Sequence, residues 1–165
     1  MRRKDREMDK NFAFTIIDKC EYGFLSSINS DSTPYCVPIS IVREENTIYF
    51  HCAHDGKKTD NMRQNPKVCL SFVGDTNIPP EKFTTEYESA VISGIATEIL
   101  EDSEKTRALK LLCLKQTPSN MHNFTQAIEQ SLKRTAVWII EITEVTGKRK
   151  KYDQNGKEMK FGRME

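Results

Sequence analysis

The chain has 165 residues, of which 30% are charged and 37% are hydrophobic, and this composition suits one soluble globular domain with a core of its own. Its 25 Lys and Arg residues nearly balance 24 Asp and Glu residues, and a net charge of +1 argues against the broad basic face of a nucleic-acid-binding protein. Because no apolar run approaches the roughly 18 residues of a membrane span and no signal-peptide pattern follows the charged start, we expect a cytoplasmic protein without a membrane or nucleic-acid partner.

The N-terminal segment has the spacing of an amphipathic helix. Met8, Phe12, Ile16 and Cys20 recur at four-residue intervals, and polar residues fill the opposite face. We expect this helix to cover one end of an apolar structure.

Three strands are predicted next. The first two, over residues 22–29 and 35–42, are joined by a turn of Ser, Asp, Thr and Pro. Pro38 lies inside the second strand and cannot donate to a sheet ladder, so we expect that strand at an edge or a bulge. The third strand, over residues 47–52, follows so short a turn that it forms a hairpin with the second.

The middle of the chain predicts one helix and two strands. The helix covers residues 56–65 and ends before Pro66, because the residue before a proline disfavours helical geometry. The strands cover residues 68–73 and 87–100, the latter broken at Gly94. The loop between them, residues 74–83, is long enough to suggest a role in function or in an interface.

Helices predicted from Asp102 and over residues 120–132, and a last strand over residues 135–145, complete a mainly β pattern. About six strands joined mostly by tight turns favour an antiparallel sheet closed into a barrel, with flanking helices. We expect one domain over residues 1–147, including the N-terminal helix, and a charged C-terminal tail over residues 148–165 that is extended or partly ordered.

The cysteines are five in number and contain no CxxC pair: Cys20, Cys36, Cys52, Cys69 and Cys113. In a reducing compartment they are expected to be free thiols, mostly buried as small apolar side chains. We expect no metal site.

The most informative stretch is residues 48–65. A strand ends at His51 and Cys52, a loop passes through Gly56, and a helix begins at Lys57 and Lys58. Glycine permits close approach of the backbone, and the free N–H groups of a helix start, together with lysines, attract an anion. The pattern therefore indicates a phosphate site, although a solvated basic loop would have the same sequence features.

Other polar side chains give weaker signals. His51-x-x-His54 lacks a third metal ligand, so His51 is expected either beside a ligand or buried with a hydrogen-bond partner. Cys52 and His51 are not expected to form a nucleophile pair, because adjacent strand residues face opposite ways. Trp138, the single tryptophan, is either a core or interface aromatic or a ring lying against a flat ligand. No GxSxG, GxGxxG or GxxxxGK[ST] motif occurs.

Six segments in order resemble the Nim-type branch of the pyridoxamine-phosphate-oxidase-like flavoproteins: MRRKDREM, CEYGFLSSI, PYCVPIS, IYFHCAHDGKKTDN, NPKVCLSFVGD and EKFTTEYESAVISGIA. The resemblance covers residues 1 to about 117 and returns at EITEVTGK. It implies a six-stranded split β-barrel that forms a two-fold homodimer, with two FMN sites shared across the subunit interface.

The resemblance also implies which residues hold FMN. The isoalloxazine edge lies along the backbone of a strand that matches Val37, Pro38, Ile39 and Ser40. The ring and the ribityl chain lie beside a segment that matches His51, Cys52 and Ala53.

Further roles implied by the resemblance concern the phosphate and the dimer. Lys58 matches a lysine that meets the FMN phosphate, and Lys57 assists it at a position where the family often has a histidine on the substrate side. Trp138 of the partner subunit would cover the flavin. Glu88 and Ser89 would lie near the dimer seam.

The implied activity is reduction of the nitro group of 5-nitroimidazoles to the amine, with the flavin supplying the chemistry and no catalytic side chain assigned. One alternative keeps the fold as a flavin- or haem-binding carrier or sensor without turnover. A pyridoxamine-phosphate oxidase would need paired arginines for its substrate phosphate, and only Arg63 lies in the relevant region. A deazaflavin-dependent relative is a further alternative.

Overall fold

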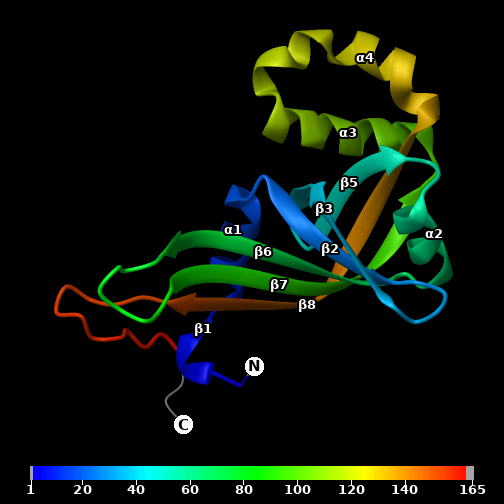
Figure 1. The fold of residues 1–165 in the computed structure, drawn as a ribbon. Coiled ribbons are helices and arrows are strands. Elements are labelled where there is room, and N and C mark those ends of the chain that lie inside the picture. The colour runs from blue at the N-terminus through cyan, green and yellow to red at the C-terminus, as the bar shows by residue number, and fades with distance from the viewer. Residues whose placement is uncertain (1, 163–165) are drawn as a thin grey trace.

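A computed structural model describes residues 2–162 of the chain, and it consists of one antiparallel sheet with flanking helices (Figure 1). The strands are β1 (Glu7–Met8), β2 (Tyr22–Ile28), β3 (Pro34–Ser40), β4 (Val42–Glu44), β5 (Thr47–Ala53), β6 (Lys67–Asn77), β7 (Glu86–Ile99) and β8 (Thr135–Lys150). Their order is β3-β2-β6-β7-β8-β5-β4, and β1 pairs with β8. The mainly β, antiparallel fold class is thus confirmed.

The sheet has eight strands rather than the six expected from the sequence. The predicted strand over residues 35–42 is two strands, because β3 ends at Ser40 and β4 begins at Val42, with the buried Ile41 between them. The short β1 is the other addition. Pro38 lies in β3, which is an edge strand as predicted. The predicted hairpin is β4–β5, and its turn places Glu45 at a positive φ of 50°.

Four α-helices flank the sheet: α1 (Lys10–Lys19), α2 (Lys57–Gln64), α3 (Asp102–Gln116) and α4 (Phe124–Ser131). Short 3-10 turns at Lys4–Arg6, Pro118–Asn123 and Leu132–Arg134 accompany them. Helix α1 begins later than its apolar spacing suggests, because the Asp9 carboxylate accepts a hydrogen bond from Phe12 N at 2.8 Å and caps the helix there. No helix in residues 2–162 is long and apolar enough to cross a membrane.

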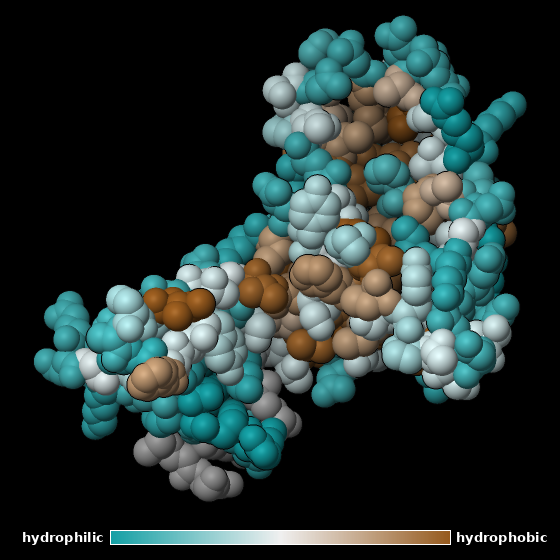
Figure 2. All heavy atoms as spheres, in the orientation of Figure 1, coloured by the Kyte–Doolittle hydropathy of each residue, from teal (hydrophilic) through white to brown (hydrophobic). Residues whose placement is uncertain are grey.

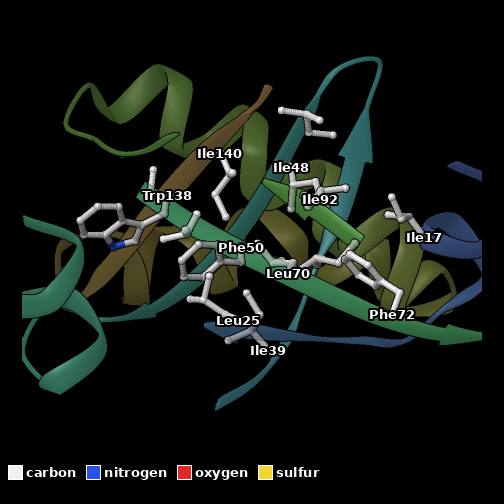
Figure 3. Packing of buried hydrophobic residues seen from close by; sticks show 14 of the residues in the cluster. Ile17, Leu25, Ile39, Ile48, Phe50, Leu70, Phe72, Ile92, Trp138 and Ile140 are labelled. Atoms are coloured by element: carbon white, nitrogen blue, oxygen red, sulfur yellow. The ribbon is translucent and has the colours of Figure 1, made fainter. Parts of the chain in front are cut away.

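The main hydrophobic core lies inside the barrel and is formed by buried side chains of the strands and of α1 (Figure 3). Ile16 and Ile17 of α1 close one end of it, and Phe50 stacks on Trp138 with ring centroids 6.5 Å apart. A second cluster lies outside the barrel, where Leu109 and Leu112 of α3 pack over Tyr49 of β5. The inward residues of β2 alternate with exposed ones, as expected for a strand with one buried face.

The long strands β6, β7 and β8 extend beyond the barrel as an arm (Figure 1). Strand β6 continues to Asn77, so the expected loop over residues 74–83 is shorter than its sequence suggested. Strand β8 continues through Gly147 to Lys150, well beyond the expected end at residue 145, so the basic run from Lys148 lies largely in a strand. The expected break in β7 is a bulge, where a Cβ on Gly94 would lie 2.6 Å from the Glu141 carbonyl oxygen.

Beyond β8 the chain returns toward the N-terminal segment. An isolated bridge joins Tyr152 and Glu158. Arg6 Nε donates to the Glu158 carboxylate at 2.7 Å, and Lys160 Nζ donates to the Asp5 carboxylate at 2.7 Å. The two ends of the described chain are therefore held together by ion pairs.

Candidate functional site

The candidate site begins at the gap where the barrel is split. The strand path ends at β3 on one side and at β4 on the other, so the sheet is not closed by hydrogen bonds. Strands β3 and β5 nevertheless contact each other across the gap. Within residues 2–162, β3 pairs with β2 along one edge only, and its other edge presents unpaired backbone groups.

Helix α2 starts beside this gap in a conformation suited to an anion. Gly56 precedes it with a φ of +142°, which L side chains rarely adopt, and no side chain caps the helix start. The Thr59 hydroxyl donates to the Gly56 carbonyl oxygen at 2.6 Å and so does not occupy the N–H groups of the first turn. Those N–H groups and the helix dipole are available to a phosphate.

The two lysines at this helix start reach toward opposite sides of the gap. Lys57 Nζ lies 5.1 Å from the centre of the Tyr35 ring on β3. Lys58 Nζ lies 5.5 Å from the centre of the Phe50 ring on β5. The two ammonium groups and the helix start therefore form a positively charged group of donors at the gap.

Buried polar side chains fix α2 in this position. Asn61 is buried, and its Nδ2 donates to Ser27 Oγ at 3.2 Å and to Asn29 Oδ1 at 2.8 Å. Thr59 is almost completely buried as well. Arg63 on the same helix forms a bidentate ion pair with Glu98 of β7, in which Nε donates to Oε2 at 2.9 Å and Nη2 donates to Oε1 at 3.1 Å. The sequence did not identify Thr59 and Asn61 as site residues, because nothing local distinguishes a buried Asn from a solvated one.

The end of β5 places His51, Cys52 and Ala53 next to Lys58. His51 and Ala53 are exposed, whereas Cys52 packs against the core, so the predicted opposition of His51 and Cys52 is confirmed. Partial desolvation and the nearby Lys58 charge lower the pKa of His51. Burial raises the pKa of the Cys52 thiol. A neutral imidazole and a protonated thiol therefore flank the lysines at neutral pH.

The polar contacts of His54 are with Lys133 and Glu98 and not with His51. Its Nε2 lies 3.1 Å from the Lys133 carbonyl oxygen, and its Nδ1 lies 3.7 Å from the Glu98 carboxylate. Residues 2–162 hold no cluster of three or more His, Cys, Asp or Glu side chains that would suit a metal ion.

Strand β3 supplies the other side of the gap. Ile39 is buried and Val37 packs against the core, while Pro38 is exposed and Ser40 is half-buried. These residues alternate between the two faces of the strand, so only their backbone forms one continuous edge. The structure thus brings Val37–Ser40, His51–Ala53 and the two lysines to the two sides of one gap.

Trp138 does not belong to this group. Its ring is 1% exposed, lies in the core on β8 and stacks on Phe50 (Figure 3). This burial does not support the expectation that Trp138 covers a flavin bound to a second subunit, because Trp138 has almost no surface that a neighbouring chain can reach. Its position opposite Phe50 across the β5–β8 pair explains the burial.

Glu88 lies in the arm, where its carboxylate pairs with Lys19 at 3.0 Å and Arg149 at 3.2 Å, and its expected place near a dimer seam stays a prediction. The cysteines are free thiols, but none is fully buried: Cys36 is exposed and the other four are half-buried. The strands that carry them alternate, so several point to the outer face of the sheet.

A family profile described as pyridoxamine 5'-phosphate oxidase matches residues 9–149. The chain belongs to this family. The matched residues include most strands of the split sheet, α2 with both lysines, and most of β8. No curated protein matches the chain.

Solved structures share the fold at low sequence identity. A proposed 5-nitroimidazole antibiotic resistance protein from Bacteroides thetaiotaomicron superposes with a TM-score of 0.72 at 23% identity, over 87% of this chain and 86% of that one. An FAD- and haem-binding protein from Mycobacterium smegmatis gives 0.76 at 14% identity, over 88% and 73%. An FAD-binding protein from Mesorhizobium loti gives 0.63 at 18% identity, over 87% and 96%.

Proposed function

We propose that the chain binds FMN in the gap between β3 and β5 and uses it to reduce nitro groups of 5-nitroimidazole-type compounds. The observation that carries the proposal is the uncapped start of α2, with Gly56 at positive φ and Lys57 and Lys58 directed to the two sides of the gap. Free backbone N–H groups and two ammonium groups make a donor set that fits a phosphate monoester.

Each part of the gap has a role in this proposal. Lys58, Lys57 and the first N–H groups of α2 hold the phosphate. The unpaired edge of β3, from Val37 to Ser40, offers backbone donors and acceptors to the edge of the isoalloxazine ring. His51 and Ala53 lie on the exposed side of β5, where they border the ring and the ribityl chain. The bound flavin supplies hydride or electron transfer, while these residues position it and exclude water around it.

The substrate proposal is supported by the resemblance to the Nim-type branch and by the fold shared with a proposed 5-nitroimidazole resistance protein. A second candidate function is a carrier or sensor of flavin or haem. The observation that favours it is His51, an exposed imidazole with a lowered pKa, which is a suitable neutral ligand for a haem iron.

We also propose a homodimer that forms through the outer face of the sheet. Phe24, Val73 and Val91 point to this face and are 45%, 55% and 38% exposed. Ser71 joins them in register, because it pairs with Phe24 on one side and with Val91 on the other. Figure 2 shows apolar side chains gathered over the middle of the sheet. Apolar residues in adjacent rows on one face are typical of an interface between subunits.

One experiment separates the two functions. The purified protein is incubated with FMN or with haem, and its absorbance spectrum and its turnover of a 5-nitroimidazole with a reduced nicotinamide donor are measured. The proposal predicts flavin bands at about one FMN per chain and formation of the amine. A Soret band without flavin uptake, or bound FMN that never transfers electrons to any nitro compound or donor, would support the carrier and contradict the reductase.

A further inference from the structure

A cavity lies at the opposite end of β3 from the lysines. It has a volume of about 270 Å³ and is lined by Glu21, Tyr22, Ser40, Lys115 and Gln116. Near one end of strand β3 (Pro34–Ser40), the Tyr35 ring lies 5.1 Å from Lys57 Nζ, and at the other end Ser40 borders this cavity. The cavity thus begins where the strand proposed to border the isoalloxazine ring ends.

Lys115 places a half-buried positive charge in the wall of this cavity. Its Nζ donates to the Cys20 carbonyl oxygen at 3.0 Å, which caps the end of α1 and uses one of its three N–H donors. The carboxylate of Asp18 on α1, whose charge acts on Lys115, is held at both oxygens by Arg43, at 2.9 and 2.6 Å. Burial lowers the pKa of Lys115, and the positive charge of Arg43 acts in the same direction.

The other residues of the cavity suit a flat ligand. Tyr22 is 55% exposed, so its aromatic side chain is accessible to a ligand in this cavity. Gln116 adds an amide donor and Ser40 a hydroxyl. Glu21 is the one carboxylate in the lining, and it would repel an anionic ligand that Lys115 attracts. The lining therefore combines an aromatic surface with one cation and one anion.

We infer that this cavity is a substrate subsite for planar aromatic compounds that carry a carboxylate or nitro group, with the two oxygens of that group bound by Lys115 and the ring placed on Tyr22. The inference rests on the proposed FMN site, because it identifies which compounds would be held beside the flavin. Lys115 is a positioning residue in this role. Glu21 weakens the binding of anions and so tunes the preference between charged and neutral substrates.

The test is calorimetric titration of the FMN-loaded protein, and of the flavin-free protein, with benzoate, benzamide and nitrobenzene. These probes share one ring and differ in charge and in the number of acceptor oxygens. We expect benzoate to bind about tenfold or more tightly than benzamide, because a charge-assisted hydrogen bond is stronger than a neutral one. Lys115→Ala and Lys115→Gln should lose this preference, and both should weaken nitrobenzene binding.

Matched variants define the controls. Lys115→Arg keeps the charge and should keep the preference, and Lys110→Ala removes an exposed lysine of the same helix and should change nothing. Glu21→Gln should strengthen benzoate binding. Equal affinity for benzoate and benzamide in the wild type, or an unchanged preference in Lys115→Gln, would overturn the inference.

The FMN content of the same preparations keeps the two proposals apart. If wild type and Lys115→Gln each hold about one FMN per chain while the benzoate preference is absent, only the subsite is wrong. If no FMN binds, the proposed function fails, and benzoate titration of the flavin-free chain still decides whether the anion subsite exists.

Discussion

Lys57 and Lys58 are adjacent in sequence, yet their ammonium groups lie over aromatic rings on opposite sides of the split barrel, Tyr35 on β3 and Phe50 on β5. Successive residues of a helix diverge by about 100° around its axis. A pair of lysines at the start of α2 is therefore the shortest sequence that reaches both sides of the gap. In the proposed FMN site, this arrangement would account for two lysines where a single phosphate-binding lysine would suffice for charge.

The position of α2 depends on Asn61. Replacement by Ala removes the donor that serves Ser27 and Asn29 and leaves their oxygens without this partner in a buried setting. We expect Asn61→Ala to lower the free energy of unfolding by about 1–3 kcal/mol. Urea unfolding measures this change, and Gln64→Ala on the exposed side of the same helix is the control. A loss equal to that of the control would mean that Asn61 does not anchor α2.

The burial of Trp138 in the core predicts a contribution to stability and none to a ligand site. We expect Trp138→Ala to cost about 3–5 kcal/mol of stability, as for other large residues in a packed core. Trp138→Phe should lower the stability by less than about 1.5 kcal/mol, because the replacement keeps an aromatic ring against Phe50. It also loses no hydrogen bond, since Nε1 of the indole has no partner among the described residues. Folded Trp138→Phe protein should bind FMN as the wild type does. A large loss of FMN affinity in this variant would contradict this prediction and indicate that Trp138 contributes to the FMN site.

These two residues mark what the sequence could and could not predict. The helix over residues 56–65, the edge position of Pro38 and the hairpin before β5 follow from local chemistry, namely a glycine, two prolines and a short turn, and they were predicted correctly. The burial of Asn61 and Trp138 depends on which strands lie opposite them. Partners such as Ser27 and Phe50 are distant in sequence, so no local pattern identifies them.

Strand length was also beyond local prediction. The segment from Thr146 to Lys150 contains no apolar side chain that would indicate a buried strand, so its sequence predicts a tail. It is a strand because Lys148 pairs in register with Ser89 of β7 and with Glu7 of β1, and because Arg149 pairs with Glu88. Neighbours on both sides satisfy the backbone hydrogen bonds there, whatever the side chains are.

The C-terminal segment should detach in acid. The Arg6 guanidinium and the Lys160 ammonium hold the pKa of Glu158 at about 2, below its ordinary value of 4.5. A carboxyl group whose pKa is lower in the folded state stabilises that state above the unfolded pKa, and its contribution is lost as the pH falls from about 4.5 through about 2. Asp5, whose pKa is lowered by Arg3 and Lys160, acts in the same direction.

Hydrogen exchange follows this detachment. The Phe161 N–H donates to the Asp5 carbonyl oxygen at 3.0 Å, so its protection, corrected for the intrinsic rate, should fall over this pH range. Glu158→Gln should show weak protection of Phe161 already at neutral pH. The amide of Leu25 in the core of β2 is the internal control and should stay protected. Constant protection of Phe161 down to pH 2 would contradict the role of Glu158.

The proposed dimer face is tested by a single charge. Val91→Lys places an ammonium group in the middle of the apolar rows of β2, β6 and β7, and burying it in an interface is costly. We expect a dimer for the wild type and a monomer for this variant in light scattering after gel filtration. Leu100→Lys, at a residue that is 78% exposed beyond the end of β7, is the control and should remain dimeric. A monomeric wild type would refute the proposed interface.

The most direct test of the account is a comparison of FMN with riboflavin, which has the same ring and ribityl chain and lacks the phosphate. Fluorescence titration of the flavin-free protein should give an FMN affinity at least about tenfold higher than the riboflavin affinity, since the phosphate gains charge-assisted hydrogen bonds at the start of α2. Lys58→Ala should remove most of that difference and leave riboflavin binding unchanged, while Lys110→Ala should alter neither. Equal affinities for FMN and riboflavin in the wild type, or an unchanged FMN preference in Lys58→Ala, would contradict a phosphate site at the split of the barrel.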